Sequence, residues 1–143
     1  MTFVLDASVT MCWLLLDGKP AARAHAMRVL DAMKLAETSA QVPVTWALEI
    51  SNVIGKAEAR GLLREAQSEA FLELLASVNI SADPATFSRA LSDTLQIARR
   101  HGLSAYDASY LELAMREGLP LATLDQDLAK AAAKAGVIRF AVK

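Results

Sequence analysis

The amino-acid sequence predicts an α/β protein whose mostly parallel central sheet is covered by helices on both faces. Short apolar runs alternate with longer helical patterns along the 143 residues. Strands that are separated by helical segments are joined by crossover connections, which parallel pairing requires. Pro20 and Pro84 stand where helices are predicted to begin, and Gly102 and Gly118 where helices end. We predict one domain over residues 1–143, since this length buries a sizeable core.

The first half of the chain alternates strand and helix signals. The run TFVL at residues 2–5 is typical of a short buried strand. Pro20 suits the first turn of a helix because its missing N–H has no partner to lose there. Trp46 and Ile50 begin an apolar pattern at helical spacing that ends near Gly61. The predicted strands of this half lie at 2–5 and 41–44, and the predicted helices at 8–16, 20–37 and 45–61.

The second half repeats the alternation. Phe71, Leu72 and Leu75 recur at helical spacing in a segment without breakers. Ser104 and Asp107 resemble a capping box in which Asp replaces the usual Glu, so a helix should begin there. The predicted helices of this half lie at 64–76, 84–101, 104–117 and 125–135, and the predicted strands at 78–81, 119–123 and 137–142.

Four carboxylates stand beside strongly apolar sequence. Asp6 closes TFVLD, Glu49 lies in WALEISN, Asp107 in LSAYDASYLELA, and Asp125 closes LPLATLD. Ionised groups at the edge of a core are costly unless they are hydrogen-bonded, paired or bound to a cation. Asp6 and Asp125 follow strands, and parallel sheets bind ligands beyond the carboxyl ends of their strands. Because Asp107 and Glu49 lie in first turns of helices, we expect all four at one rim.

Carboxylate oxygens are ligands for hard divalent cations, so we expect such a cation to bind at this rim. The chain has only one cysteine and two histidines, so Mg²⁺, or Mn²⁺ as an alternative, is expected as one or two ions. Mg²⁺ retains waters, so we expect Asp6 and Asp107 as direct ligands and Asp125 and Glu49 as ligands through water or of a second ion. Such an ion assists attack of water on phosphorus. The predicted chemistry is metal-assisted cleavage of an anionic substrate.

Each carboxylate taken singly also has a structural interpretation. Asp6 and Asp125 can cap the helices that follow their strands, Asp107 can pair with Ser104, and Glu49 can be a solvated helix charge. The occurrence of all four at one predicted rim favours a site. A haloacid dehalogenase phosphatase is disfavoured because it needs a second Asp at the position of Ser8. A receiver domain is disfavoured because no early adjacent acidic pair is present.

Composition limits the partners. The net charge is −1, from 15 basic and 16 acidic residues, which argues against a protein that coats nucleic acid non-specifically. Arg99 and Arg100 are candidates for a local RNA contact, with a solvated helix face as the alternative. The 54% hydrophobic share indicates an apolar interface, for which Trp13 and residues 14–16 are candidates.

Location is also constrained by the sequence. No apolar stretch approaches the roughly 20 residues that a membrane-spanning helix needs. The single cysteine, Cys12, cannot form an internal disulfide. We therefore expect the reducing cytoplasm and no membrane partner.

The ordered set VLDAS, ALEISN, ARRHGLSAYDASYLELA and LPLATLDQDLAKAA resembles PIN-domain ribonucleases, and in particular the VapC-type toxins of type II toxin-antitoxin pairs. The similarity extends from Val4 to Val142 and is most specific over residues 102–132. It implies a three-layer α/β/α fold, Mg²⁺-dependent cleavage of structured RNA such as tRNA or rRNA, and inhibition by a cognate antitoxin. The family's acidic positions correspond to Asp6, Glu49, Asp107 and Asp125, accompanied by the hydroxyl positions Ser8 and Thr123.

The resemblance also implies a homodimer and an antitoxin segment that lies across the acidic rim. Two alternatives to a toxin are a housekeeping PIN nuclease in RNA maturation and a non-catalytic interaction protein with the PIN fold. All four acids of the family pattern are present, so the sequence gives no sign of a dead enzyme. Loss of metal binding would distinguish the non-catalytic alternative.

Overall fold

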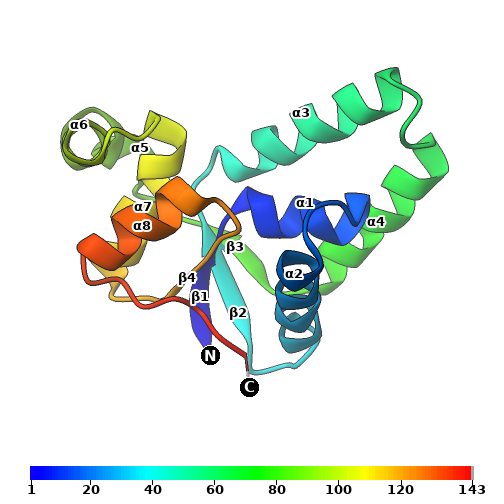
Figure 1. Ribbon diagram of the computed structural model, residues 1–143, viewed down its shortest axis with the longest axis horizontal. Helices are drawn as coiled ribbons and strands as arrows, with labels where there is room; N and C mark the ends of the chain where they lie inside the picture. Colours follow the sequence, from blue (N-terminus) through cyan, green and yellow to red (C-terminus); the bar gives the residue numbers. More distant parts are fainter. Residues whose placement is uncertain (143) are drawn as a thin grey trace.

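The computed structural model describes residues 1–142 and contains a parallel sheet between layers of helices (Figure 1). The sheet has four strands in the order β3-β2-β1-β4, and every neighbouring pair is parallel. The strands are β1 (Thr2–Leu5), β2 (Ser39–Val42), β3 (Ile80–Ala82) and β4 (Leu121–Ala122). The predicted α/β class is therefore confirmed.

The helices cover both faces of this sheet. Figure 1 shows α1 and α2 on one side and α5 to α8 on the other, while α3 and α4 project as a pair from the α1 side. This arrangement confirms the three layers that the family resemblance implied. The helices are α1 (Ala7–Leu15), α2 (Pro20–Met33), α3 (Trp46–Ala59), α4 (Glu65–Ser77), α5 (Thr86–Arg89), the π-helical η1 (Ala90–Thr94), α6 (Leu95–His101), α7 (Ala105–Glu117) and α8 (Gln126–Lys134).

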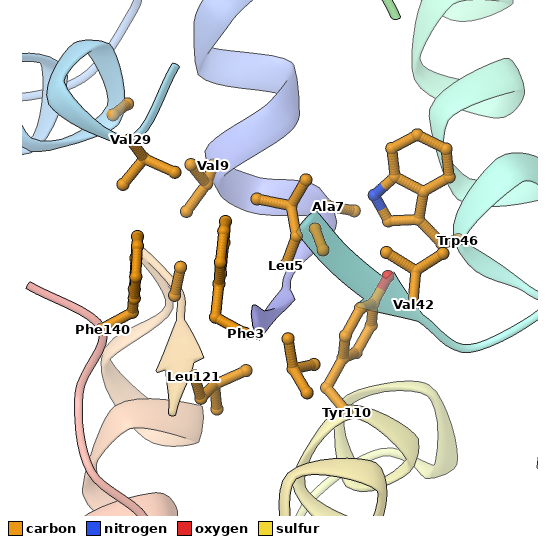
Figure 2. Packing of buried hydrophobic residues seen from close by; sticks show 14 of the residues in the cluster. Phe3, Leu5, Ala7, Val9, Val29, Val42, Trp46, Tyr110, Leu121 and Phe140 are labelled. Carbon is orange, nitrogen blue, oxygen red and sulfur yellow. The ribbon is translucent and has the colours of Figure 1, made fainter. Parts of the chain in front are cut away.

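The core is centred on β1. Phe3, Val4 and Leu5 are fully buried, as expected for a strand that has helices on both faces. Figure 2 shows the Phe3 ring beside that of Phe140, and the two rings stack with centroids 3.9 Å apart. Val4 lies between Gln41 of β2 and Leu121 of β4, so β1 has a neighbour on each edge. This packing holds the carboxyl end of β1 in a fixed place.

The predicted last strand at 137–142 is wrong. Its only pairing is an isolated parallel bridge between Leu121 and Arg139. The Ile138 carbonyl accepts a hydrogen bond from the Leu121 N–H, and the Phe140 N–H donates one to the Leu121 carbonyl, each with an N···O distance of 2.9 Å. β4 is only two residues long, where residues 119–123 were predicted, so it offers no longer ladder. Phe140 then stacks on Phe3 instead of continuing a strand.

Other differences concern boundaries and one interface. The predicted helix at 20–37 ends at Met33, and the predicted strand at 41–44 ends at Val42 because Pro43 has no N–H to donate. The predicted helix at 84–101 is divided by the π-helical segment η1. Trp13 was a candidate for either an interface or the core, and the structure places it in the core, where it donates its indole N–H to the Ala26 carbonyl at 2.8 Å. Within residues 1–142, none of the helices combines the length and apolarity that crossing a bilayer requires.

Candidate active site

The strand order creates a crevice at the carboxyl end of the sheet. The connection that follows β1 leads to β2 on one side, and the chain returns later to form β4 on the other side. Such a switch point leaves room for a ligand between the two connections. Asp6 follows β1, and Thr123 follows β4. The sheet therefore brings together two of the predicted site residues.

Asp6 is buried, with 4% of its surface exposed. Its Oδ2 atom accepts hydrogen bonds from the Ser8 hydroxyl at 2.5 Å and from the Thr123 hydroxyl at 2.8 Å. Burial raises the pKa of Asp6; the two hydroxyls oppose the rise, and the charge of Asp125 adds to it. Both hydroxyls bind the same oxygen, Oδ2, and so fix the orientation of the carboxylate.

Ser8 and Thr123 connect the two sides of the crevice. The Ser8 hydroxyl also accepts from the Leu124 N–H at 2.9 Å, and the Thr123 hydroxyl accepts from the Asp125 N–H at 3.0 Å. Each side chain thus binds Asp6 on one side and the loop after β4 on the other. Their geometry suits positioning of the carboxylates, and the predicted direct contact with a cofactor stays a prediction.

Asp125 has the capping role that the sequence allowed, and its expected role as a metal ligand stays a prediction. It is the N-cap of α8, and its Oδ1 accepts from the Leu128 N–H at 2.9 Å. This cap accounts for one oxygen of the carboxylate. The cap also fixes the side chain at the start of α8, where it lies close enough to Asp6 to raise the pKa of that residue.

Glu49 reaches the same crevice from α3. Its Oε1 accepts a hydrogen bond from the Tyr110 hydroxyl at 3.1 Å. Burial raises the pKa of Glu49 to about 7, the charges of Asp6 and Asp107 add to the rise, and the Tyr110 hydrogen bond opposes it. Tyr110 is fully buried and was missed from sequence. The available signal was its position three residues after Asp107, which puts both on one face of α7.

Asp107 lies in the first turn of α7, where its N–H donates to the Ser104 hydroxyl at 3.1 Å. Burial raises the pKa of Asp107 to about 6, and the charges of Asp6, Asp125 and Asp127 add to the rise. Charges that act on one another in this way share one region of space. The structure therefore brings together the four predicted acids, with Asp127 beside them.

The four site carboxylates lack a cationic partner. Among residues 1–142, none of them forms an ion pair with Lys, Arg or His. By contrast, the other buried carboxylates, Asp83 and Glu112, both bind Arg116, with N···O distances of 2.5 and 2.8 Å. No role was predicted for these three residues from the sequence. The fold thus neutralises acids elsewhere and leaves the charge of the crevice uncompensated.

The crevice fits a hydrated divalent cation. Across the described part of the chain, no three Asp, Glu, His or Cys side chains are close enough to enclose an ion as they stand. Mg²⁺ needs only one or two direct carboxylates, because it keeps several waters that further carboxylates can bind. Asp6 and the acids around it provide such a set, and a cation would relieve the repulsion that adds to the raised pKa values of Asp6, Glu49 and Asp107.

Comparison with known proteins agrees with this geometry. Residues 3–134 match the PIN domain family. The chain belongs to the PIN-domain family. The match includes all four acids of the crevice and both hydroxyl residues that hold Asp6.

Relatives of this PIN-domain protein include two that are named Ribonuclease VapC3. The chain is 33% identical over 130 residues to the one from Mycobacterium tuberculosis strain H37Rv, which covers 90% of this chain and 85% of the relative. It is 37% identical over 84 residues to the one from Pyrobaculum aerophilum, which covers 59% of this chain and 64% of the relative.

Two solved structures share the fold. PAE2754 from Pyrobaculum aerophilum superposes with a TM-score of 0.66 at 26% identity and covers 97% of this chain and 83% of its own. FitAcB from Neisseria gonorrhoeae gives a TM-score of 0.58 at 20% identity, with 98% and 96% covered. The second likeness concerns the fold alone.

Proposed function

We propose that this protein is a metal-dependent endoribonuclease, the toxin of a toxin-antitoxin pair that cleaves structured RNA such as tRNA or rRNA. The observation that carries the proposal is the group of four carboxylates at the switch point of a PIN fold, none of which forms an ion pair within residues 1–142. The name shared by the two relatives, Ribonuclease VapC3, supports the substrate class. Phosphodiester hydrolysis is the chemistry that a hard cation on such a rim supplies.

The chain's own residues hold and orient the reacting groups. Asp6 and Asp107 would bind Mg²⁺ or Mn²⁺ directly, with Asp125 and Glu49 acting through its waters or on a second ion. The bound ion would supply positive charge that promotes ionisation of an attacking water and neutralises charge on the phosphoryl oxygens. Ser8 and Thr123 hold Asp6 in place, and Tyr110 holds Glu49. These hydrogen bonds restrict the orientations of Asp6 and Glu49 before an ion binds.

Two partners belong to the proposal. An antitoxin would inhibit by laying an Arg or Lys side chain over the crevice, where it takes the place of the cation. A second copy of the chain would cover exposed apolar side chains in a homodimer. An open reading frame for a short protein immediately beside the gene would support the toxin assignment over a housekeeping role in RNA maturation.

The test is cleavage of a panel of structured RNAs by purified protein. We expect endonucleolytic products with Mg²⁺ or Mn²⁺ and none in EDTA. Calorimetric titration of Mg²⁺ into the RNA-free protein gives a second measurement that does not depend on finding the right RNA. A protein that binds neither metal nor RNA would be a non-catalytic member of the family, and the proposal would be wrong.

A further inference from the structure

A second hollow lies beside the crevice, between the end of α6 and the exposed side of α8. It has a volume of about 510 Å³. Arg100 and His101 line it from α6, and Asp127, Lys130 and Lys134 line it from α8. We call the hollow lined by these five residues the basic cleft. Figure 1 shows α6 and α8 on the same side of the sheet, far from the outer end of α3.

The basic cleft concentrates positive charge in a chain whose net charge is −1. Arg100, Lys130 and Lys134 are exposed, and Asp127 is the only acid among the lining residues. Within residues 1–142, none of the three cations forms an ion pair. Their charges are therefore free to act on a ligand.

Helix electrostatics explains only part of this arrangement. Cations in the last turn of a helix are favoured by its dipole, and Arg100 and Lys134 both occupy last turns. Lys130 is not in the last turn of α8, and the dipole gives no reason for the two helices to direct their cations into one hollow. A function for the cleft accounts for both facts.

The cleft begins at the acidic crevice and leads away from it along α8. Asp125 caps this helix, and Asp127 is close enough to Asp107 for their charges to interact. Lys130 and Lys134 then follow at a spacing of four residues, which is about 6 Å along the helix axis. The cations thus line a path that starts at the proposed reaction site.

We infer that the basic cleft binds backbone phosphates of the RNA strand on one side of the bond that is cut. This inference rests on the proposed function and adds a place for the flanking strand. A crevice of four acids repels a polyanion, so the energy for holding the substrate must come from cations nearby. The contacts are to phosphates and not to base edges, since a lysine ammonium group acts as a point charge and phosphate contacts carry no sequence information.

The test is the salt dependence of RNA binding by the full chain. The probe is a fluorescein-labelled single-stranded RNA of twenty nucleotides, measured by anisotropy in EDTA, with a gel to verify that the RNA stays intact. In the double variant Lys130→Gln with Lys134→Gln, two phosphate contacts are lost. The negative slope of log Kobs against log salt should become shallower by about 1.4. At 0.1 M salt this change corresponds to binding about 25-fold weaker. The matched control is Lys56→Gln with Arg60→Gln, two cations at the outer end of α3, which should bind RNA like wild type.

The possible outcomes test RNA binding by the cleft separately from RNA cleavage by the protein. A reduced slope in the cleft variant alone supports the inference, even if the wild-type protein binds the RNA and cleaves none. An unchanged slope, or an equal loss in the α3 control, overturns it, even if the wild-type protein cleaves RNA. A decaglutamate peptide is the probe for a protein partner. If Lys130 and Lys134 govern binding of that peptide and not of RNA, the cleft is a docking surface for an acidic segment and the inference is wrong.

Discussion

Asp6 is the buried member of the four site carboxylates, and its environment shows how the site is built. Two hydroxyls hold one of its oxygens, and burial together with the charge of Asp125 raises its pKa. A charge so placed weakens the metal-free fold, so its presence needs a functional reason. The same repulsion makes the crevice receptive to a cation.

The first prediction concerns Asp6→Asn and Asp107→Asn. Each should reduce RNA cleavage by roughly a hundredfold or more, because each deletes an anionic ligand that the ion needs. Thermal unfolding in EDTA should give a melting temperature equal to or above that of wild type, since one repelling charge is gone. Asp31→Asn, on the exposed face of α2, should leave both quantities unchanged. Full activity in either site variant would refute the assignment.

The second prediction concerns pH. In the metal-free fold Glu49 and Asp107 have pKa values of about 7 and about 6, above their ordinary values of 4.5 and 3.8. As pH rises from 4 to 8, these two groups lose their protons at lower pH in the unfolded chain than in the folded protein. The folded state therefore binds more protons over this range. The free energy of unfolding that these groups contribute falls as pH rises. Addition of Mg²⁺ at pH 8 should restore stability.

Comparison of wild type with Glu49→Gln isolates this effect. The lowered pKa of His25 has the opposite influence, since its charging destabilises the fold at low pH, but it is common to both proteins. We expect melting temperature in EDTA to fall less between pH 5 and pH 8 in Glu49→Gln. Equal falls in the two proteins would show that Glu49 ionises normally.

The acids of the candidate site could be singled out from sequence because each follows a strand or lies in the first turn of a helix, which is local information, whereas Ser8 and Thr123 came from the family resemblance. Tyr110 escaped because a tyrosine in an apolar helical pattern has the signature of a core residue, and it is indeed fully buried. The ion pair between Arg116 and Asp83 escaped for another reason. Asp83 lies 33 residues away along the chain, and only the folded structure brings the two together.

At the scale of elements, helix ends were easier to predict than strand pairing. α7 begins after the Ser104 cap and ends at Gly118, which adopts the left-handed conformation with φ of 64°. Both signals are read from neighbouring residues. The length of β4, and whether residues 137–142 form a strand, depend on pairing partners that are far away in the chain. Stacking of Phe140 on Phe3 could not be read from local pattern.

The third prediction concerns Arg116, which joins the end of β3 to α7 through Asp83 and Glu112. Arg116→Met should lower the free energy of unfolding by about 3 kcal/mol, because it leaves two buried carboxylates without a cation. Arg89→Met removes an exposed pair with Asp93 and should cost less than about 1 kcal/mol. Urea unfolding measures both. Equal losses would mean that the buried trio is no more important than a surface pair.

At the scale of the whole molecule, exposed apolar side chains remain after the fold is complete. Phe87 and Leu91 are each 90% exposed and lie four residues apart on the α5 and η1 segment. Two large apolar side chains this exposed on adjacent turns are candidates for the interface of the proposed homodimer. Because Trp13 is buried, Phe87 and Leu91 are better candidates than Trp13 for contacts in a dimer interface.

The fourth prediction is that the protein is a homodimer at micromolar concentration and that Phe87→Asp with Leu91→Asp makes it a monomer. Charges at the centre of an apolar interface have no partner when the copies associate. Sedimentation velocity measures the state. Leu62→Asp, at another exposed apolar position, should leave the dimer intact. A monomeric wild type would contradict the prediction.

The fifth prediction concerns inhibition by the cognate antitoxin of the proposed function. Its Arg or Lys side chain and Mg²⁺ would compete for the same carboxylates, so the inhibitor should bind more weakly as Mg²⁺ is raised at constant ionic strength. Asp125→Asn should weaken the inhibitor further. Calorimetry at several Mg²⁺ concentrations is the measurement. An affinity independent of Mg²⁺ would mean that inhibition acts away from the crevice.

The hydrogen bond between Thr123 and Asp6 joins residues 117 positions apart. During synthesis the amino-terminal acid emerges from the ribosome long before its partner, and α7 and α8 have yet to be translated. A nascent chain therefore carries Asp6 and Glu49 without the second half of their site. On the proposed function, a ribosome that makes this protein is not exposed to its nuclease until translation has passed residue 125.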